Sequence, residues 1–177
     1  ESMDRIVVAV DPATTGKSTS DESGIIVAGV KNRHFYVLED CSLRASPDKV
    51  CRRAVQAYHD HKADRIVFEA NQGGETWRTI VKGIDPQAAT KDVHASRGKV
   101  SRAEPVSARY EQGRCSHVMT AGLDALEDQM VSYVPGLTTK SPDRLDALVW
   151  AITELDTRRQ TEVVINPGEN FTPKVFF

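Results

Sequence analysis

The first forty residues alternate between apolar runs and short polar links. Runs rich in β-branched residues predict strands at 5–11, 24–30 and 34–38. The first run, RIVVAVD, is almost continuously apolar, which is typical of a strand buried on both faces. The link at 31–33 is short enough for a hairpin, so we expect the chain to open as an antiparallel meander.

From residue 46 onward the pattern changes to strands that alternate with helices. Ser46 and Pro47 predict the start of a helix that continues to about Lys62, and Pro105 is expected to open a helix that Gly113 closes. Further strands are predicted at 65–70, 91–95 and 115–119, and further helices at 75–82, 123–134 and 141–157. This order predicts an α/β fold with a central mixed sheet, an antiparallel meander followed by parallel strands, flanked by helices.

The chain has 177 residues, enough for one domain, which we expect to span 3–159 with a loosely held tail at 160–177. The two residues before Met3 look like a tag remnant, which favours a domain excised from a longer protein. No apolar run reaches membrane-spanning length, so we expect neither a membrane span nor a signal peptide.

The cysteines predict neither a disulfide framework nor a zinc site. None of the three lies in a close pair, so we expect reduced thiols and a cytoplasmic location. They are Cys41, Cys51 and Cys115.

The stretch TGKST at 15–19 resembles the second half of a phosphate-binding P-loop. The motif requires a glycine at the position that Asp11 occupies, and a helix must follow it. Here a polar stretch and then a strand follow, so no helix N-terminus faces a phosphate. We therefore interpret 14–23 as a hairpin loop, in which Asp21 is a solvated residue.

Three carboxylates on separate elements are embedded in apolar sequence. Asp11 ends the first strand, and Glu69 lies near the end of the strand at 65–70. Each has a simpler interpretation, because Asp11 could form a turn and Glu69 could point to water. Asp146 borders the apolar stripe of the last helix, so it is expected to be partly buried and to need a cation or hydrogen-bond donors. Asp143, one turn earlier, could instead stabilise the helix dipole.

A pair of hard divalent cations would explain why three carboxylates are embedded in apolar sequence. Mg²⁺ and Mn²⁺ prefer carboxylate oxygens, and two such ions can promote phosphodiester cleavage by water. Spacing along the chain alone does not establish that the side chains meet.

Several segments, taken in order, resemble the nuclease domain of the large terminase subunit of tailed phages. They are VAVDPA with DESGI, IVFEANQGG, KVSRAEPVSARYEQGRCSHV and DRLDALVWAITEL, and together they span about residues 5–156. The resemblance implies a ribonuclease H-like fold whose sheet carries an acidic cluster. It also implies metal-dependent endonuclease cleavage of double-stranded DNA during genome packaging, with two Mg²⁺ or Mn²⁺ ions.

Carried over by position, the acidic cluster is Asp11, Glu69 and Asp146, the catalytic and metal-binding residues that the resemblance implies. Asp143 is a supporting metal ligand, and Asp21, in the hairpin region, is a weaker one. Large terminases carry an ATPase domain before the nuclease, and this sequence supplies none. The partners implied are an ATPase motor domain, the small terminase subunit and the portal, in the host cytoplasm.

The segment 97–114 carries a local excess of positive charge in a chain of net charge −2. Such a patch suits contacts to DNA phosphates, although a solvated helix face is the ordinary alternative. The candidate DNA-binding residues are Arg97, Lys99, Arg102, Arg109 and Arg114.

Three other functions remain open at this point. A junction resolvase or recombinase nuclease would share the fold and prefer branched DNA. A noncatalytic DNA-binding or motor-docking module would bind DNA without cutting it. An actin-like kinase also opens with a strand, an aspartate and a hairpin, but it normally needs a second domain.

Overall fold

A mixed β-sheet forms the centre of the computed structural model, which describes residues 2–13, 22–70, 74–119, 122–134, 137 and 141–157. Asp21 and the tail at 160–177 lie outside these residues. In chain order the elements are β1 (Arg5–Asp11), β2 (Gly24–Lys31), β3 (His34–Asp40), α1 (Pro47–Asp60), β4 (Arg65–Glu69), α2 (Gly74–Ile84), β5 (Thr90–Val93), α3 (Lys99–Glu111), β6 (Cys115–His117), α4 (Asp124–Ser132) and α5 (Asp143–Asp156).

The described strands follow the order β5-β4-β1-β2-β3-β6 across the sheet. β1, β2 and β3 are antiparallel neighbours, as the meander predicts. β4 is parallel to β1, and β5 is parallel to β4. β6 pairs in parallel with β3 at the other edge. The expected mixed α/β sheet is therefore confirmed.

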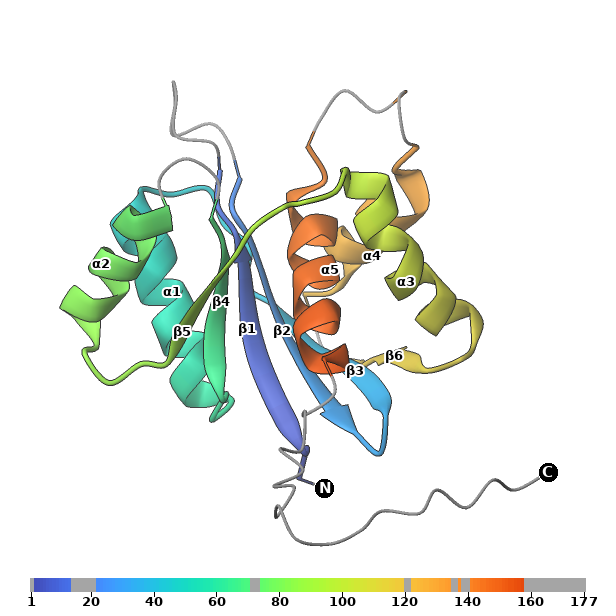
Figure 1. The fold of residues 1–177 in the computed structure, drawn as a ribbon, viewed down its shortest axis with the longest axis horizontal. Coiled ribbons are helices and arrows are strands. Elements are labelled where there is room, and N and C mark those ends of the chain that lie inside the picture. The colour runs from blue at the N-terminus through green and yellow to red at the C-terminus, as the bar shows by residue number, and fades with distance from the viewer. Residues whose placement is uncertain are drawn as a thin grey trace, which may run out of the picture.

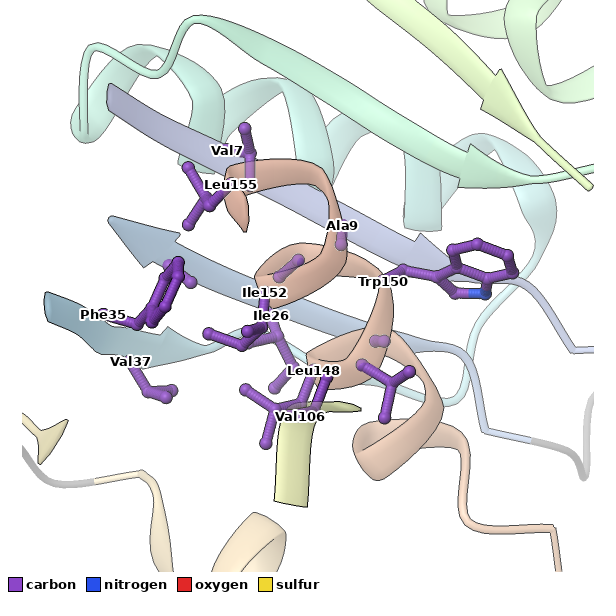
Figure 2. Packing of buried hydrophobic residues seen from close by; sticks show 14 of the residues in the cluster. Val7, Ala9, Ile26, Phe35, Val37, Val106, Leu148, Trp150, Ile152 and Leu155 are labelled. Atoms are coloured by element: carbon purple, nitrogen blue, oxygen red, sulfur yellow. The ribbon is translucent and has the colours of Figure 1, made fainter. Parts of the chain in front are cut away.

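Helices cover both faces of the sheet, with α1 and α2 on one side and α3, α4 and α5 on the other (Figure 1). Side chains alternate along β1, so Val8 and Val10 pack with residues of α1 and α2. Val7 and Ala9 pack on the opposite face with residues of α5 (Figure 2). Because this alternation has a period of two, Asp11 falls on the face that α5 covers.

Gly24 allows the beginning of α5 to approach the sheet closely. It lies opposite Asp11 in the β1–β2 register. A Cβ atom at Gly24 would come within 2.0 Å of the carbonyl oxygen of Asp143 and 3.1 Å of the Cβ of Ala147. Only a residue without a side chain fits there, and the first turn of α5 is thereby brought next to the end of β1.

Helix α3 begins earlier than the sequence predicts. Pro105 is not the start of the helix, because α3 begins at Lys99 and Pro105 lies inside it. Proline in a helix interior removes one backbone hydrogen bond. The preceding turn forms nevertheless, because Lys99 and Arg102 make ion pairs with the buried carboxylates described below. Tertiary contacts here outweigh the local preference.

At its other end α5 is tied to several strands through Glu154. This carboxylate is 4% exposed. It forms ion pairs with Arg5 of β1 at 3.5 Å, with Arg65 of β4 at 3.3 Å and with Lys91 of β5 at 2.7 Å.

Among the helices of the described residues, none has the length and apolar character needed to cross a bilayer.

Candidate active site

The carboxyl ends of β1 and β4 place Asp11 and Glu69 side by side. The two strands are parallel, with Val10 paired to Phe68, so the residues that follow these two are also neighbours. Both side chains are buried, Asp11 at 8% and Glu69 at 6% exposure, and a hydrogen bond joins them. The interpretation of Glu69 as a strand-end residue pointing to water is therefore wrong.

Asp146 joins this pair from the first turn of α5. It is 5% exposed, and its Oδ2 accepts a hydrogen bond of 2.5 Å from the Nζ of Lys99. Its Oδ1 lies 4.0 Å from the Nη2 of Arg102. The sequence-based expectation that Asp146 is buried and needs a cation is thus confirmed, and the cation comes from α3.

Asp11 experiences the negative charge of the whole cluster. Burial, and then the charges of Glu69, Asp146 and Asp143, raise the pKa of Asp11 to about 9. In this structure Asp11 is therefore a neutral acid at pH 7, able to donate its proton to Glu69. Carboxylates this crowded are the donor set that a hard divalent cation would neutralise.

Glu69 has donors on its Oε2 atom. The indole nitrogen of Trp150 donates to it at 2.7 Å, and the Nη1 of Arg102 lies 3.4 Å away. Burial acts to raise the pKa of Glu69, but the Trp150 hydrogen bond, the Arg102 charge and the bond from Asp11 outweigh it and hold that pKa below its usual value. Glu69 is therefore the carboxylate of the pair that stays charged.

Asp143 lies at the margin of the cluster. It is only half-buried. Burial raises the pKa of Asp143, while a hydrogen bond from Ser141 and the charge of Lys99 oppose that rise. Its charge also contributes to the raised pKa of Asp11, so it lies within electrostatic reach of the core of the site.

The basic residues of α3 divide into two groups. Lys99 and Arg102, in its first turn, belong to the carboxylate cluster, with 44% and 11% of their side chains exposed. The charge of Asp146, which accepts a hydrogen bond from Lys99, outweighs burial and raises the pKa of Lys99. Arg97, just before the helix, is exposed.

The second basic group lies toward the other end of α3 and has partners of its own. The Nη2 of Arg109 is 2.8 Å from Asp156. The Nη2 of Arg114 donates to the carbonyl of Arg33 at 2.7 Å. Of the five basic residues expected to contact DNA, three lie on α3, and Arg97 and Arg114 lie just before and just after it.

Two cavities flank α5. One of about 370 Å³ lies between α3 and α5 and is lined by Arg97, Arg102 and Trp150, so it opens beside the carboxylates. A larger one of about 610 Å³ is lined by Arg5, Arg114 and Leu155, at the opposite end of the helix. The candidate site is therefore identified by the carboxylate cluster and not by the size of the neighbouring cavity.

The chemistry of the carboxylate cluster suits a divalent metal. Asp11, Glu69 and Asp146 bring carboxylate oxygens, the atoms that Mg²⁺ and Mn²⁺ prefer, from two strands and a helix, and Asp143 lies at the edge. Within the part of the chain that the structure describes, no three ligand-type side chains are already in the arrangement of a metal site. The cations of α3 compensate the negative charge instead.

A family model supports the same interpretation. The model of the terminase RNase H-like domain matches residues 8–155, which include all three carboxylates. No match was found among curated proteins.

Solved structures share the fold. The human cytomegalovirus terminase nuclease domain has a TM-score of 0.62 and 16% identity, over 87% of this chain and 86% of that chain. The nuclease domain of the large terminase subunit gp2 of bacterial virus Sf6 has a TM-score of 0.67 and 13% identity, over 86% and 89%. The large terminase of a thermophilic bacteriophage has a TM-score of 0.63 and 12% identity, over 88% of this chain and 41% of that chain.

Proposed function

Since the chain belongs to the family of terminase RNase H-like domains, we propose that it is a metal-dependent endonuclease domain that cuts double-stranded DNA during DNA packaging. The observation that carries this proposal is the meeting of Asp11, Glu69 and Asp146 in one buried carboxylate cluster. A cytomegalovirus relative has been solved after soaking with Mn. This supports Mn²⁺ or Mg²⁺ as the cofactor.

The carboxylates would hold the metal, and Asp143 would assist. Two bound Mg²⁺ or Mn²⁺ ions would activate water for attack on the phosphodiester and stabilise the leaving oxygen. Asp11 has to release its proton to act as a ligand, because burial and its neighbours keep it protonated at pH 7. Glu69 is already charged and accepts a hydrogen bond from Trp150.

Basic side chains at the beginning of α3 would contact the DNA backbone. Arg97 is exposed and Lys99 is half-exposed next to the carboxylates, so both can reach phosphates there. Arg109 and Arg114 would extend this contact along the helix. Phosphate contacts carry no sequence information, so cleavage should be largely nonspecific.

The partners follow from the family. The relative from a thermophilic bacteriophage is a large terminase that has also been solved in complex with ADP. We propose that this nuclease acts beside an ATPase motor domain, together with a small terminase subunit and a portal, in the host cytoplasm.

The test is cleavage by Asp146→Asn. This variant keeps the size of the side chain and should fold, but it should lose Mn²⁺-dependent nicking of a supercoiled plasmid by roughly 100-fold or more. Asp60→Asn, which changes an exposed acid on α1, is the matched control and should cut like the wild type. Circular dichroism of all three proteins shows that the fold is retained, and full nicking by Asp146→Asn would count against the proposed site.

The substrate distinguishes this function from its alternatives. Equal cutting of linear and branched DNA supports a packaging nuclease, whereas a strong preference for four-way junctions would indicate a resolvase. DNA binding without cleavage in Mg²⁺ or Mn²⁺ would indicate a noncatalytic module.

A further inference from the structure

Trp150 connects the hydrophobic core to the carboxylate cluster. The residue is 8% exposed and belongs to the cluster that packs α5 on the sheet (Figure 2). Its indole N–H donates to Oε2 of Glu69 at 2.7 Å, and both partners are buried. A buried indole N–H needs an acceptor, and a charged one makes the bond stronger than a neutral one. The rigid packing of the ring therefore fixes the position of that oxygen.

Arg102 lies over the ring of the same tryptophan. Its guanidinium carbon is 4.7 Å from the ring centroid, and its Nη1 is 3.4 Å from Oε2 of Glu69. The planar guanidinium can stack on the indole and face a carboxylate at the same time, which an ammonium group does not do. Arg102 and Trp150 thus approach one carboxylate oxygen together.

The burial of Arg102 argues against a direct role in binding DNA. Only 11% of its side chain is exposed. Its Nε and Nη1 atoms are buried and, within the described residues, have no hydrogen-bond acceptor in suitable geometry. A group that contacts phosphate needs accessible nitrogens, as on the exposed Arg97. Arg102 instead directs its charge inward, toward Glu69 and Asp146.

We propose that Arg102 and Trp150 are positioning residues that hold the Glu69 carboxylate in the orientation required for metal binding, and that Arg102 does not contact DNA. The inference rests on the proposed function, because it gives Glu69 its role as a ligand. Groups that hold a metal ligand in place typically change metal affinity or activity by about 10–100-fold when they are removed.

The first experiment measures Mn²⁺ affinity by calorimetry, without DNA. Trp150→Phe keeps an aromatic ring in the core but removes the N–H, so Mn²⁺ affinity should fall about 10-fold or more. Trp77→Phe is the matched control, since Trp77 is buried beside Phe68 on the opposite face of the sheet. Its affinity should equal that of the wild type. An unchanged affinity in Trp150→Phe overturns the proposal.

The second experiment uses the indole as a reporter, so it does not depend on the folding of Trp150→Phe. The chain has two tryptophans, and Trp77→Phe leaves Trp150 as the sole one. Titration with Mg²⁺ should change its fluorescence in a saturable way that EDTA reverses. A fluorescence signal that stays constant while calorimetry records Mg²⁺ binding also overturns the proposal.

The third experiment separates positioning from DNA contact. Arg102→Lys keeps the charge but loses the planar group, so kcat should fall about 10-fold with an unchanged KM for DNA. Arg97→Ala should raise the KM and leave Mn²⁺ affinity unchanged. A raised KM with an unchanged kcat in Arg102→Lys would make Arg102 a DNA contact.

Failure of the inference and failure of the proposed function are distinguishable. A wild-type protein that binds Mn²⁺ and cuts DNA, with Trp150→Phe behaving identically, contradicts the positioning role alone. A wild-type protein that neither binds Mn²⁺ nor cuts DNA contradicts both.

Discussion

The carbonyl oxygen of Asp143 lies so close to Gly24 that a Cβ atom on the glycine would approach it to 2.0 Å. Gly24 is also the β2 partner of Asp11. One residue without a side chain therefore determines how near the first turn of α5, with Asp146, comes to the strand that carries Asp11.

Gly24→Ala should damage both stability and the site. The added methyl group meets backbone rather than a flexible side chain, so α5 has to shift, at a cost of about 3 kcal/mol in the free energy of unfolding. Urea denaturation measures this loss, and calorimetry should show weaker Mn²⁺ binding because Asp146 moves away from Asp11.

Gly83→Ala provides the control for that substitution. Gly83 is in α2, and a Cβ atom there would meet nothing within 4 Å. Glycine in a helix lowers the stability by roughly 0.5–1 kcal/mol relative to alanine, so this variant should be slightly more stable than the wild type. Equal effects of the two substitutions would contradict the close-approach argument.

Asp11→Asn should stabilise the metal-free protein at high pH. The carboxyl has an ordinary pKa of 3.8, and burial with neighbouring charges raises the pKa of Asp11 to about 9 in the folded protein. Between these values the folded state binds more protons than the unfolded state, so wild-type stability falls as pH rises from about 4 to 9. Asparagine does not titrate and can still donate to Glu69.

The measurement is the thermal midpoint of both proteins across pH, in EDTA. The advantage of Asp11→Asn should be about 3 °C or more at pH 8 and should shrink steadily toward pH 4. A constant difference at all pH values would show that Asp11 does not titrate as described.

Metal binding at pH 7 should release a proton. Asp11 is protonated in the metal-free protein and has to be ionised to bind a cation. The observed calorimetric enthalpy of Mg²⁺ binding should therefore differ between Pipes and Tris, whose ionisation enthalpies differ. The same enthalpy in both buffers would mean that no proton leaves, and Asp11→Asn should remove the buffer dependence.

Glu154→Gln should destabilise the protein without affecting the carboxylate cluster directly. The change removes the charge that three basic side chains share, and two of these are 41% exposed, so water recovers part of the loss. We expect about 2 kcal/mol by urea denaturation. Asp48→Asn, in an exposed pair with Arg52, should cause a much smaller loss; an equal loss would refute the role of Glu154.

Much of the sheet could be predicted from alternation along the strands. The pattern of β1 puts Asp11 on the same face as Ala9, and that of β4 puts Glu69 on the same face as Val67. Parallel pairing then makes the two carboxylates neighbours. The pairing itself is a long-range contact, so local pattern alone does not reveal it.

The contacts between α3 and α5 are the part of the candidate site that could not be predicted from the sequence. Pro105 suggests a helix start because local propensity says nothing of the ion pair that Lys99 makes at the beginning of α3. The charge of Arg102 suggests a DNA surface, although only 11% of its side chain is exposed. Trp150, four residues after Asp146 and hence on the same side of α5, is the signal that could have identified a partner for Glu69.

Helix α5 is positioned at both ends, by its close approach to Gly24 at the first turn and by the Glu154 ion pairs at the last. Because these two contacts are far apart along the helix, α5 can neither shift along the sheet nor rotate about its own axis. The spacing between the carboxylates is thus a property of the scaffold, and adjustment to an incoming ion or DNA strand falls to the half-exposed side chain of Lys99.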